Sequence, residues 1–248
     1  MGWSRNAALV SLVCSLLSPV HGQTLKAPVP DDGDRLEMAL NNGDADALLR
    51  LVAPPLRGEL QNRFDRFAES FPGAQWTVDR LEPLVDGRSR LRVSVRGVGR
   101  SDGLMYRLQA SQTLAVRLQA GGVIQEQEVL DDRSLLRSGT ARLPISVRLP
   151  AAVLTGSRYD IDVIVEKPLG SAVLAGGLVE LKQASGDASL SPAIPLEPLG
   201  GGGLFKRVRA PQTPGVQRWA VMLVHPDGVV TATQQVRVVA DAAELARY

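Results

Sequence analysis

The sequence predicts an α+β fold in which N-terminal helices pack on an antiparallel sheet and an all-β sandwich follows. Two observations support this prediction. Up to residue 71, apolar residues recur at spacings of three and four, which is the period of an amphipathic helix. From residue 75 onward, apolar and polar residues alternate instead, and turn sequences such as Asp-Gly and Gly-Gly separate the alternating runs.

The composition is ordinary for a globular protein of one or two domains. The 248 residues are 44% hydrophobic and 22% charged, so the chain can bury a core. Its 28 basic and 26 acidic residues leave a formal net charge of +2. Such a balanced charge gives no argument for a nucleic acid or an anionic membrane surface as the partner, and we predict neither.

Residues 1–22 are typical of a secretory signal peptide. Arg5 provides a basic start, an apolar run extends from Ala7 to Val20, and small residues suited to cleavage end at Gly22. We expect cleavage after Gly22, export to the periplasm or the extracellular space, and a proline-broken linker over residues 23–30. An apolar run of about 14 residues is too short to span a bilayer, so we expect no membrane span after cleavage.

The single cysteine, Cys14, lies in this segment. A lipoprotein signal at Cys14 is the alternative, but the bulky Val13 before it disfavours that interpretation. A mature chain without cysteine excludes a thiolate nucleophile, a zinc–thiolate site and disulfides, so its own core must hold the fold together.

Two helices are expected before residue 54. Asp31 or Asp32 can cap a first helix that runs to about Asn42. Gly43 can take the left-handed conformation that closes this helix, and Asp44 can cap the second. The second helix is expected to end at residue 53, because the prolines at 54 and 55 remove backbone donors.

A third helix is expected from Leu56 to Ser70. Its apolar residues form one stripe, which predicts core packing rather than a cofactor site; these are Leu56, Leu60, Phe64, Phe67 and Phe71. Four strands are then expected at residues 75–85, 90–98, 104–118 and 123–137, with Gly97 and Gly99 marking a bulge or bend. In the second strand, three valine or leucine residues alternate with a polar set: Arg90, Arg92, Ser94 and Arg96.

The order of three helices and a four-stranded meander resembles the nuclear-transport-factor-2-like family, which includes SnoaL-like proteins and ketosteroid isomerase. The resemblance covers residues 31–139. It rests on the helix junction Asn41–Leu49, on Pro54-Pro55 after it, and on the strand series through Leu135. It implies a curved sheet wrapped around helices as a cone with an open mouth, which serves as a site in many relatives. It also implies a possible homodimer through the sheet.

We expect residues 140–240 to form the sandwich. Short alternating runs are separated by turn sequences, and the pattern resembles an immunoglobulin-like domain without its disulfide. The expected strands cover residues 145–149, 159–165, 172–181, 204–208, 216–224 and 229–239, with a loop-rich stretch at 185–203. Trp219, Val221 and Leu223 should face the core. Residues 241–248 are expected to form a short helical tail.

Acid–base chemistry has few candidates. Glu126 and Glu128 interrupt an apolar alternation, and on alternate positions of one strand they would lie about 6.5–7 Å apart. If both faced the cavity, burial and like charge could raise the pKa of one, as a general base needs, and Tyr106 could donate a hydrogen bond there. The alternative is a solvated sheet face or a dimer contact. His225, beside a hairpin turn, is expected at a strand end, and no Gly-x-Ser-x-Gly elbow accompanies it.

These residues predict an exported, non-catalytic binding or interaction protein with no metal and no cofactor. The alternative is a small-molecule-binding protein, or an isomerase- or hydrolase-like enzyme, that uses the cavity around Tyr106, Glu126 and Glu128. A structural spacer of the cell envelope is a third possibility. The tyrosine and paired aspartates of ketosteroid isomerase have no convincing match in the sequence, so its proton-transfer activity is not expected here.

Overall fold

The computed structural model describes residues 32–139, 143–166, 173–181, 193–199, 202–226 and 228–245. The expected signal segment, the linker and Asp31 lie outside this part of the chain. So do the residues at 140–142, most of the expected loop at 185–203, Asp227 of the last hairpin turn and the final three residues.

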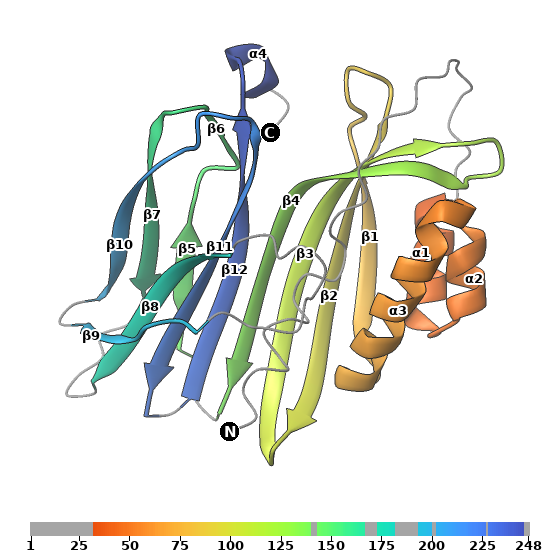
Figure 1. The fold of residues 1–248 in the computed structure, drawn as a ribbon. Coiled ribbons are helices and arrows are strands. Elements are labelled where there is room, and N and C mark those ends of the chain that lie inside the picture. Colours follow the sequence, from red (N-terminus) through yellow and green to blue (C-terminus); the bar gives the residue numbers. More distant parts are fainter. Residues whose placement is uncertain are drawn as a thin grey trace. The chain divides into compact units, whose positions relative to one another are not determined.

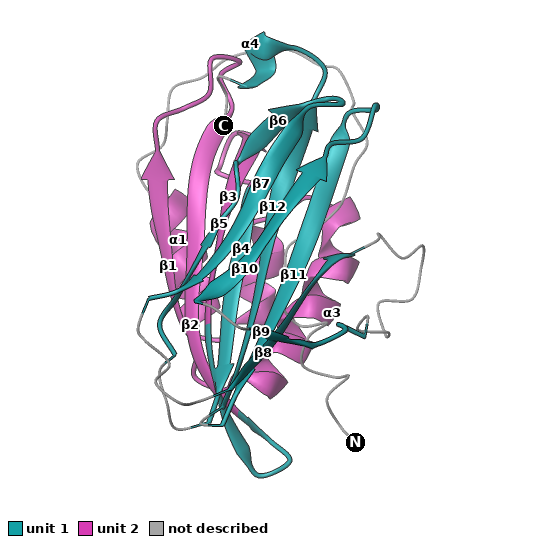
Figure 2. Ribbon diagram, turned by 90° about the vertical axis from the view of Figure 1, so that its left-hand side faces the viewer, with its two compact units in different colours: residues 1–10, 100–108, 131–248 teal, residues 11–99, 109–130 magenta. Residues whose placement is uncertain are grey.

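The chain divides into two compact units (Figure 2). The helical unit contains described residues 32–99 and 109–130, and the sandwich unit contains described residues 100–108 and 131–245. The division cuts through long strands rather than falling at a linker. The predicted domain boundary near residue 140 stays a prediction.

The predicted fold class is confirmed, because N-terminal helices pack against a large antiparallel sheet and a second, small antiparallel sheet follows (Figure 1). The first seven elements are α1 (Asp32–Asn41), α2 (Ala45–Arg50), α3 (Pro54–Ser70), β1 (Gln75–Leu81), β2 (Ser89–Ser101), β3 (Leu104–Leu118) and β4 (Ile124–Ser138).

The junctions between the helices combine confirmed and corrected predictions. Gly43 has a positive φ of 65°, and the Asp44 side chain accepts a hydrogen bond from the Ala47 amide at 2.8 Å, so both caps are confirmed. The second helix was wrongly expected to continue to residue 53. Instead, the Leu51 carbonyl accepts a bond from the Ile124 amide at 2.8 Å, and the Ala53 amide donates to the Ile124 carbonyl at 2.9 Å.

The third helix begins two residues earlier than expected, at Pro54. A proline is tolerated in the first helical turn because the amide groups there have no helical partner anyway. The predicted apolar stripe is confirmed, with Phe64, Phe67 and Phe71 buried. The rings of Phe67 and Trp76 have centroids 5.0 Å apart, which places α3 against β1 in the core of the helical unit.

Gly97 and Gly99 let the end of α3 approach β2 closely. A Cβ on Gly97 would lie 3.0 Å from the Phe71 side chain, and a Cβ on Gly99 would lie 2.3 Å from the Ser70 carbonyl oxygen. Cβ atoms do not come that close to backbone oxygens. Close packing against the end of α3 therefore explains why glycine occupies both positions.

The free edge of β1 is capped by side chains of α1. Asn41 accepts a hydrogen bond from the Trp76 amide at 2.8 Å and donates one to the Trp76 carbonyl at 2.9 Å. Glu37 accepts a bond from the Val78 amide at 2.8 Å. These contacts satisfy backbone groups that an edge strand would otherwise offer to another chain.

The remaining elements form the sandwich. They are β5 (Ile145–Arg148), β6 (Ala152–Leu154), β7 (Arg158–Val165), β8 (Leu174–Leu181), β9 (Glu197–Leu199), β10 (Gly203–Arg209), β11 (Gly215–His225), β12 (Gly228–Val239) and α4 (Ala242–Leu245). The larger sheet has the order β1-β2-β3-β4-β12-β11-β8-β9, with β6 on β12, and the smaller sheet has the order β10-β7-β5. The short strands β6 and β9 were missed, and β9 lies within the stretch expected to be loop-rich.

Two apolar clusters fill the space between the sheets of the sandwich unit. One joins Val163 and Val165 of β7 to Val221 and Leu223 of β11. The other joins Ile161 to Trp219 and to residues of β12. The predicted inward direction of Trp219, Val221 and Leu223 is confirmed, since each is at most 3% exposed.

Candidate functional site

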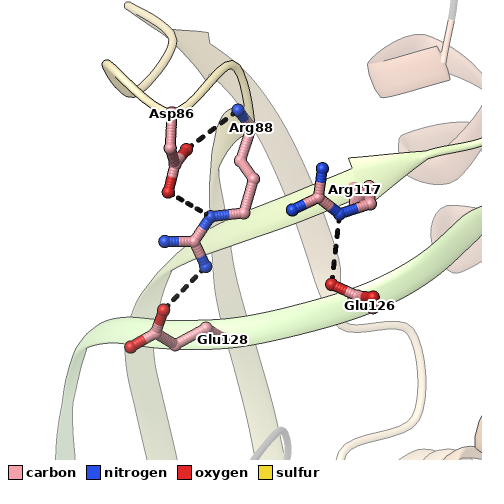
Figure 3. A network of polar contacts seen from close by, with 5 residues as sticks. All are labelled: Asp86, Arg88, Arg117, Glu126 and Glu128. Atoms are coloured by element: carbon pink, nitrogen blue, oxygen red, sulfur yellow. Dashed lines mark hydrogen bonds and ion pairs between the residues drawn. The ribbon is translucent and has the colours of Figure 1, made fainter. Parts of the chain in front are cut away.

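Glu128 is bound to an arginine that precedes β2. The Arg88 Nη1 atom donates to the Glu128 carboxylate at 2.7 Å, and its Nε atom donates to the Asp86 carboxylate at 2.8 Å (Figure 3). The Arg88 amide also donates to Asp86 at 3.1 Å. The Arg88 side chain is 17% exposed and that of Glu128 is 30% exposed. This network fixes the connection between β1 and β2 to β4.

The charge on Arg88 is secured by its two carboxylates. Partial burial acts to lower the pKa of Arg88, but its hydrogen bonds and ion pairs with Glu128 and Asp86 outweigh burial and raise that pKa. Arg88 therefore stays cationic and holds Glu128 as a structural counterion.

Glu126 is paired with Arg117 of β3 (Figure 3). The Arg117 Nε atom donates to its carboxylate at 3.2 Å, and the two side chains are 49% and 38% exposed. Such an exposed, solvent-screened pair is typical of a sheet surface. The structure thus places both candidate glutamates beside arginines on the helical unit.

Tyr106 is half-buried on β3. It belongs to the sandwich unit, whereas Glu126 and Glu128 belong to the helical unit. His225 ends β11 and lies opposite Gly228 of β12, which is the strand-end position expected for it. Within the described ranges, no group of three or more histidine, cysteine, aspartate or glutamate side chains could hold a metal ion.

A row of arginines on β2 was present in the sequence pattern but was not recognised as a candidate site. Arg90, Arg92 and Arg96 alternate with the buried Leu91, Val93 and Val95, so they lie on the opposite face of β2 from these core residues. Arg92 and Arg96 are exposed, and Arg90 is half-buried. The sequence feature that could have indicated this site is the regular spacing of arginines along one predicted strand.

A buried chain of polar side chains in the sandwich unit was also missed. Trp219 Nε1 donates to the Tyr159 hydroxyl at 2.9 Å, and that hydroxyl donates to the Gln217 side chain at 2.9 Å. The Gln217 amide then donates to Glu180 at 3.0 Å. These residues lie up to 60 positions apart in the chain, so no local pattern could indicate the contact.

Comparison with known proteins adds a domain but no activity. The family model described as "Domain of unknown function (DUF8623)" matches residues 140–239, which contain β5 to β12 of the sandwich unit. No curated protein matches the chain. Among the described residues, no helix has both the length and the apolar character needed to cross a membrane.

Proposed function

We propose that the protein is an exported, non-catalytic binding protein. The observation that carries this proposal is the ion pairing of both candidate carboxylates. A general base needs a carboxylate that is free to take a proton, whereas Glu128 is engaged by the cationic Arg88 and Glu126 by Arg117. The interpretation of this pair as an acid–base site therefore has less support than a structural role.

The proposed architecture remains a nuclear-transport-factor-2-like unit followed by an immunoglobulin-like sandwich. Three helices followed by a meander of long strands support the first assignment, and two apolar clusters between facing sheets support the second. Export rests on the signal-like residues 1–22. Mass spectrometry of the secreted chain should find Gln23 as its first residue, and an N-terminus that retains Met1 would contradict export by cleavage.

A peptide panel tests the binding function. The purified chain is titrated with fluorescent peptides that are acidic, neutral or basic, and binding is followed by anisotropy. We expect at least one class to bind saturably, with equal affinity for the wild type and for the variant with Glu126→Gln and Glu128→Gln. Absence of binding in every class, or a loss of binding in this variant, would contradict the proposal.

A further inference from the structure

We propose that the exposed face of β1 and β2 binds an acidic protein segment in an extended conformation, through Arg90, Arg92 and Arg96. This inference rests on the proposed binding function and names its partner class. All three arginines lie within the helical unit, on the single strand β2.

The face carries an excess of positive charge that no ion pair among the described residues neutralises. Opposite the three arginines, β1 presents Leu81, Asp79 and Gln75 at the paired positions. Asp79 is thus the only acidic residue in the described pairing of β1 with β2 on this face, and it forms no ion pair with Arg92. None of the three arginines forms an ion pair within the described part of the chain, and the Nε atom of Arg90 is buried without a hydrogen-bond partner.

The spacing of the arginines fits an extended peptide. Side chains at alternate positions of a strand lie about 6.5–7 Å apart, so Arg90 and Arg92 match two carboxylates at alternate positions of an extended segment. Arg96 matches a third carboxylate two repeats further along. Guanidinium groups bind carboxylates through paired hydrogen bonds, which gives the contact both direction and affinity. Ser94 lies between Arg92 and Arg96 along β2, and its hydroxyl is 3.4 Å from the Ser111 hydroxyl on β3.

Other occupants fit this face less well. A symmetric contact with the same face of a second copy would bring arginines against arginines, which is repulsive. Residues 23–31 and 182–192 of this chain contain one acidic residue each, so neither supplies the complementary charge. A single-stranded nucleic acid would need aromatic side chains for base stacking, and the described pairs of β1 and β2 place none on this face.

The test uses the full chain and a nine-residue fluorescent peptide in which glutamate and threonine alternate. A peptide of the same composition with its glutamates clustered, a lysine–threonine peptide and an oligo-dT strand are compared with it. We expect the alternating acidic peptide to bind most tightly, and its affinity to fall with salt because screening weakens exposed charge pairs. The variant Arg92→Glu with Arg96→Glu should bind it at least about tenfold more weakly.

The matched control is Arg50→Glu with Arg66→Glu, which makes the same change of net charge on α2 and α3 of the same unit. It should retain affinity within about twofold, and both variants should keep the circular dichroism of the wild type. Equal loss in the two variants, tighter binding of oligo-dT, or self-association through this face in sedimentation experiments would overturn the assignment. Peptide binding that ignores Arg92 and Arg96 would also overturn it, while leaving the proposed binding function standing.

Discussion

At the residue scale, the two glutamates should differ in what they contribute to stability. Glu128 binds the mostly buried Arg88, whereas Glu126 binds the exposed Arg117. Replacing Glu128 with glutamine should lower the free energy of unfolding by about 1 kcal/mol, since a partly desolvated guanidinium loses a charged partner. Glu126→Gln should cost less than about 0.5 kcal/mol.

Urea unfolding of both variants measures this difference. The structural interpretation predicts that Glu128→Gln is the more destabilised variant. If Glu128→Gln instead raised stability, as happens when a strained functional carboxylate is neutralised, Glu128 would return as a candidate site residue.

Tyr159 should make stability depend on pH in the alkaline range. Burial is the main cause that raises the pKa of Tyr159 above its ordinary value of 10.0; nearby Glu180 adds to this, and the hydrogen bond from Trp219 opposes it. Because the pKa is higher in the folded state, the folded protein favours the neutral phenol. This contribution is complete below about pH 10 and is lost as pH rises through the folded-state pKa.

The variant Tyr159→Phe should unfold with a free energy about 1–3 kcal/mol lower at pH 7, because Trp219 and Gln217 lose their buried partner. Its stability should also fall less steeply than that of the wild type above pH 10. Tyr106→Phe is the matched control, since the Tyr106 hydroxyl makes no hydrogen bond within the described residues. Parallel pH profiles for Tyr159→Phe and the wild type would contradict this account.

Single residues were predicted well where the signal is local. The cap at Asp44, the left-handed Gly43 and the inward Trp219 each follow from residue type and spacing within a few positions. The partner of Glu128 could not be predicted, because Arg88 lies 40 positions away and is brought to it only by the pairing of strands.

At the element scale, the contact between α3 and β2 predicts opposite effects for two glycine substitutions. Gly99→Ala should destabilise the protein by about 2 kcal/mol or more, because the new Cβ would lie 2.3 Å from the Ser70 carbonyl oxygen. Gly58→Ala should stabilise it by about 0.5–1 kcal/mol, since Gly58 lies inside α3 with nothing within 4 Å of its added Cβ.

Thermal unfolding of the two variants tests these opposite changes in stability. A melting temperature that falls for Gly99→Ala and rises for Gly58→Ala supports the close approach of α3 to β2. An unchanged melting temperature in Gly99→Ala would show that the helix end lies further from the sheet.

The long strands were predicted to within a few residues because their alternation continues over many positions. The expected ranges 104–118 and 123–137 correspond to β3 and β4. The errors lie where a distant strand competes with the local pattern. Residues 51–53 pair with Ile124 instead of continuing α2, and β9 forms because β8 offers it a partner.

At the scale of the whole molecule, the larger sheet was not predicted as one sheet. The second half of β4 pairs with β12, for example Leu135 with Ala232, so the last strand of the expected first domain also belongs to the sandwich unit. Alternation along β4 shows that it is a strand, but it carries no information about which strand lies beside it. For the same reason, the sequence could rank candidate carboxylates but could not place them in a common site.

The proposed binding surface is the exposed face of β1 and β2 that carries Arg90, Arg92 and Arg96. Backbone amide shifts of the isotope-labelled chain, recorded as the alternating acidic peptide is added, test it most directly. We predict shifts concentrated at residues 75–81 and 89–96, with β7, β10 and β11 unchanged. Shifts that centre on the sandwich unit, or on Glu126 and Glu128, would contradict the claim.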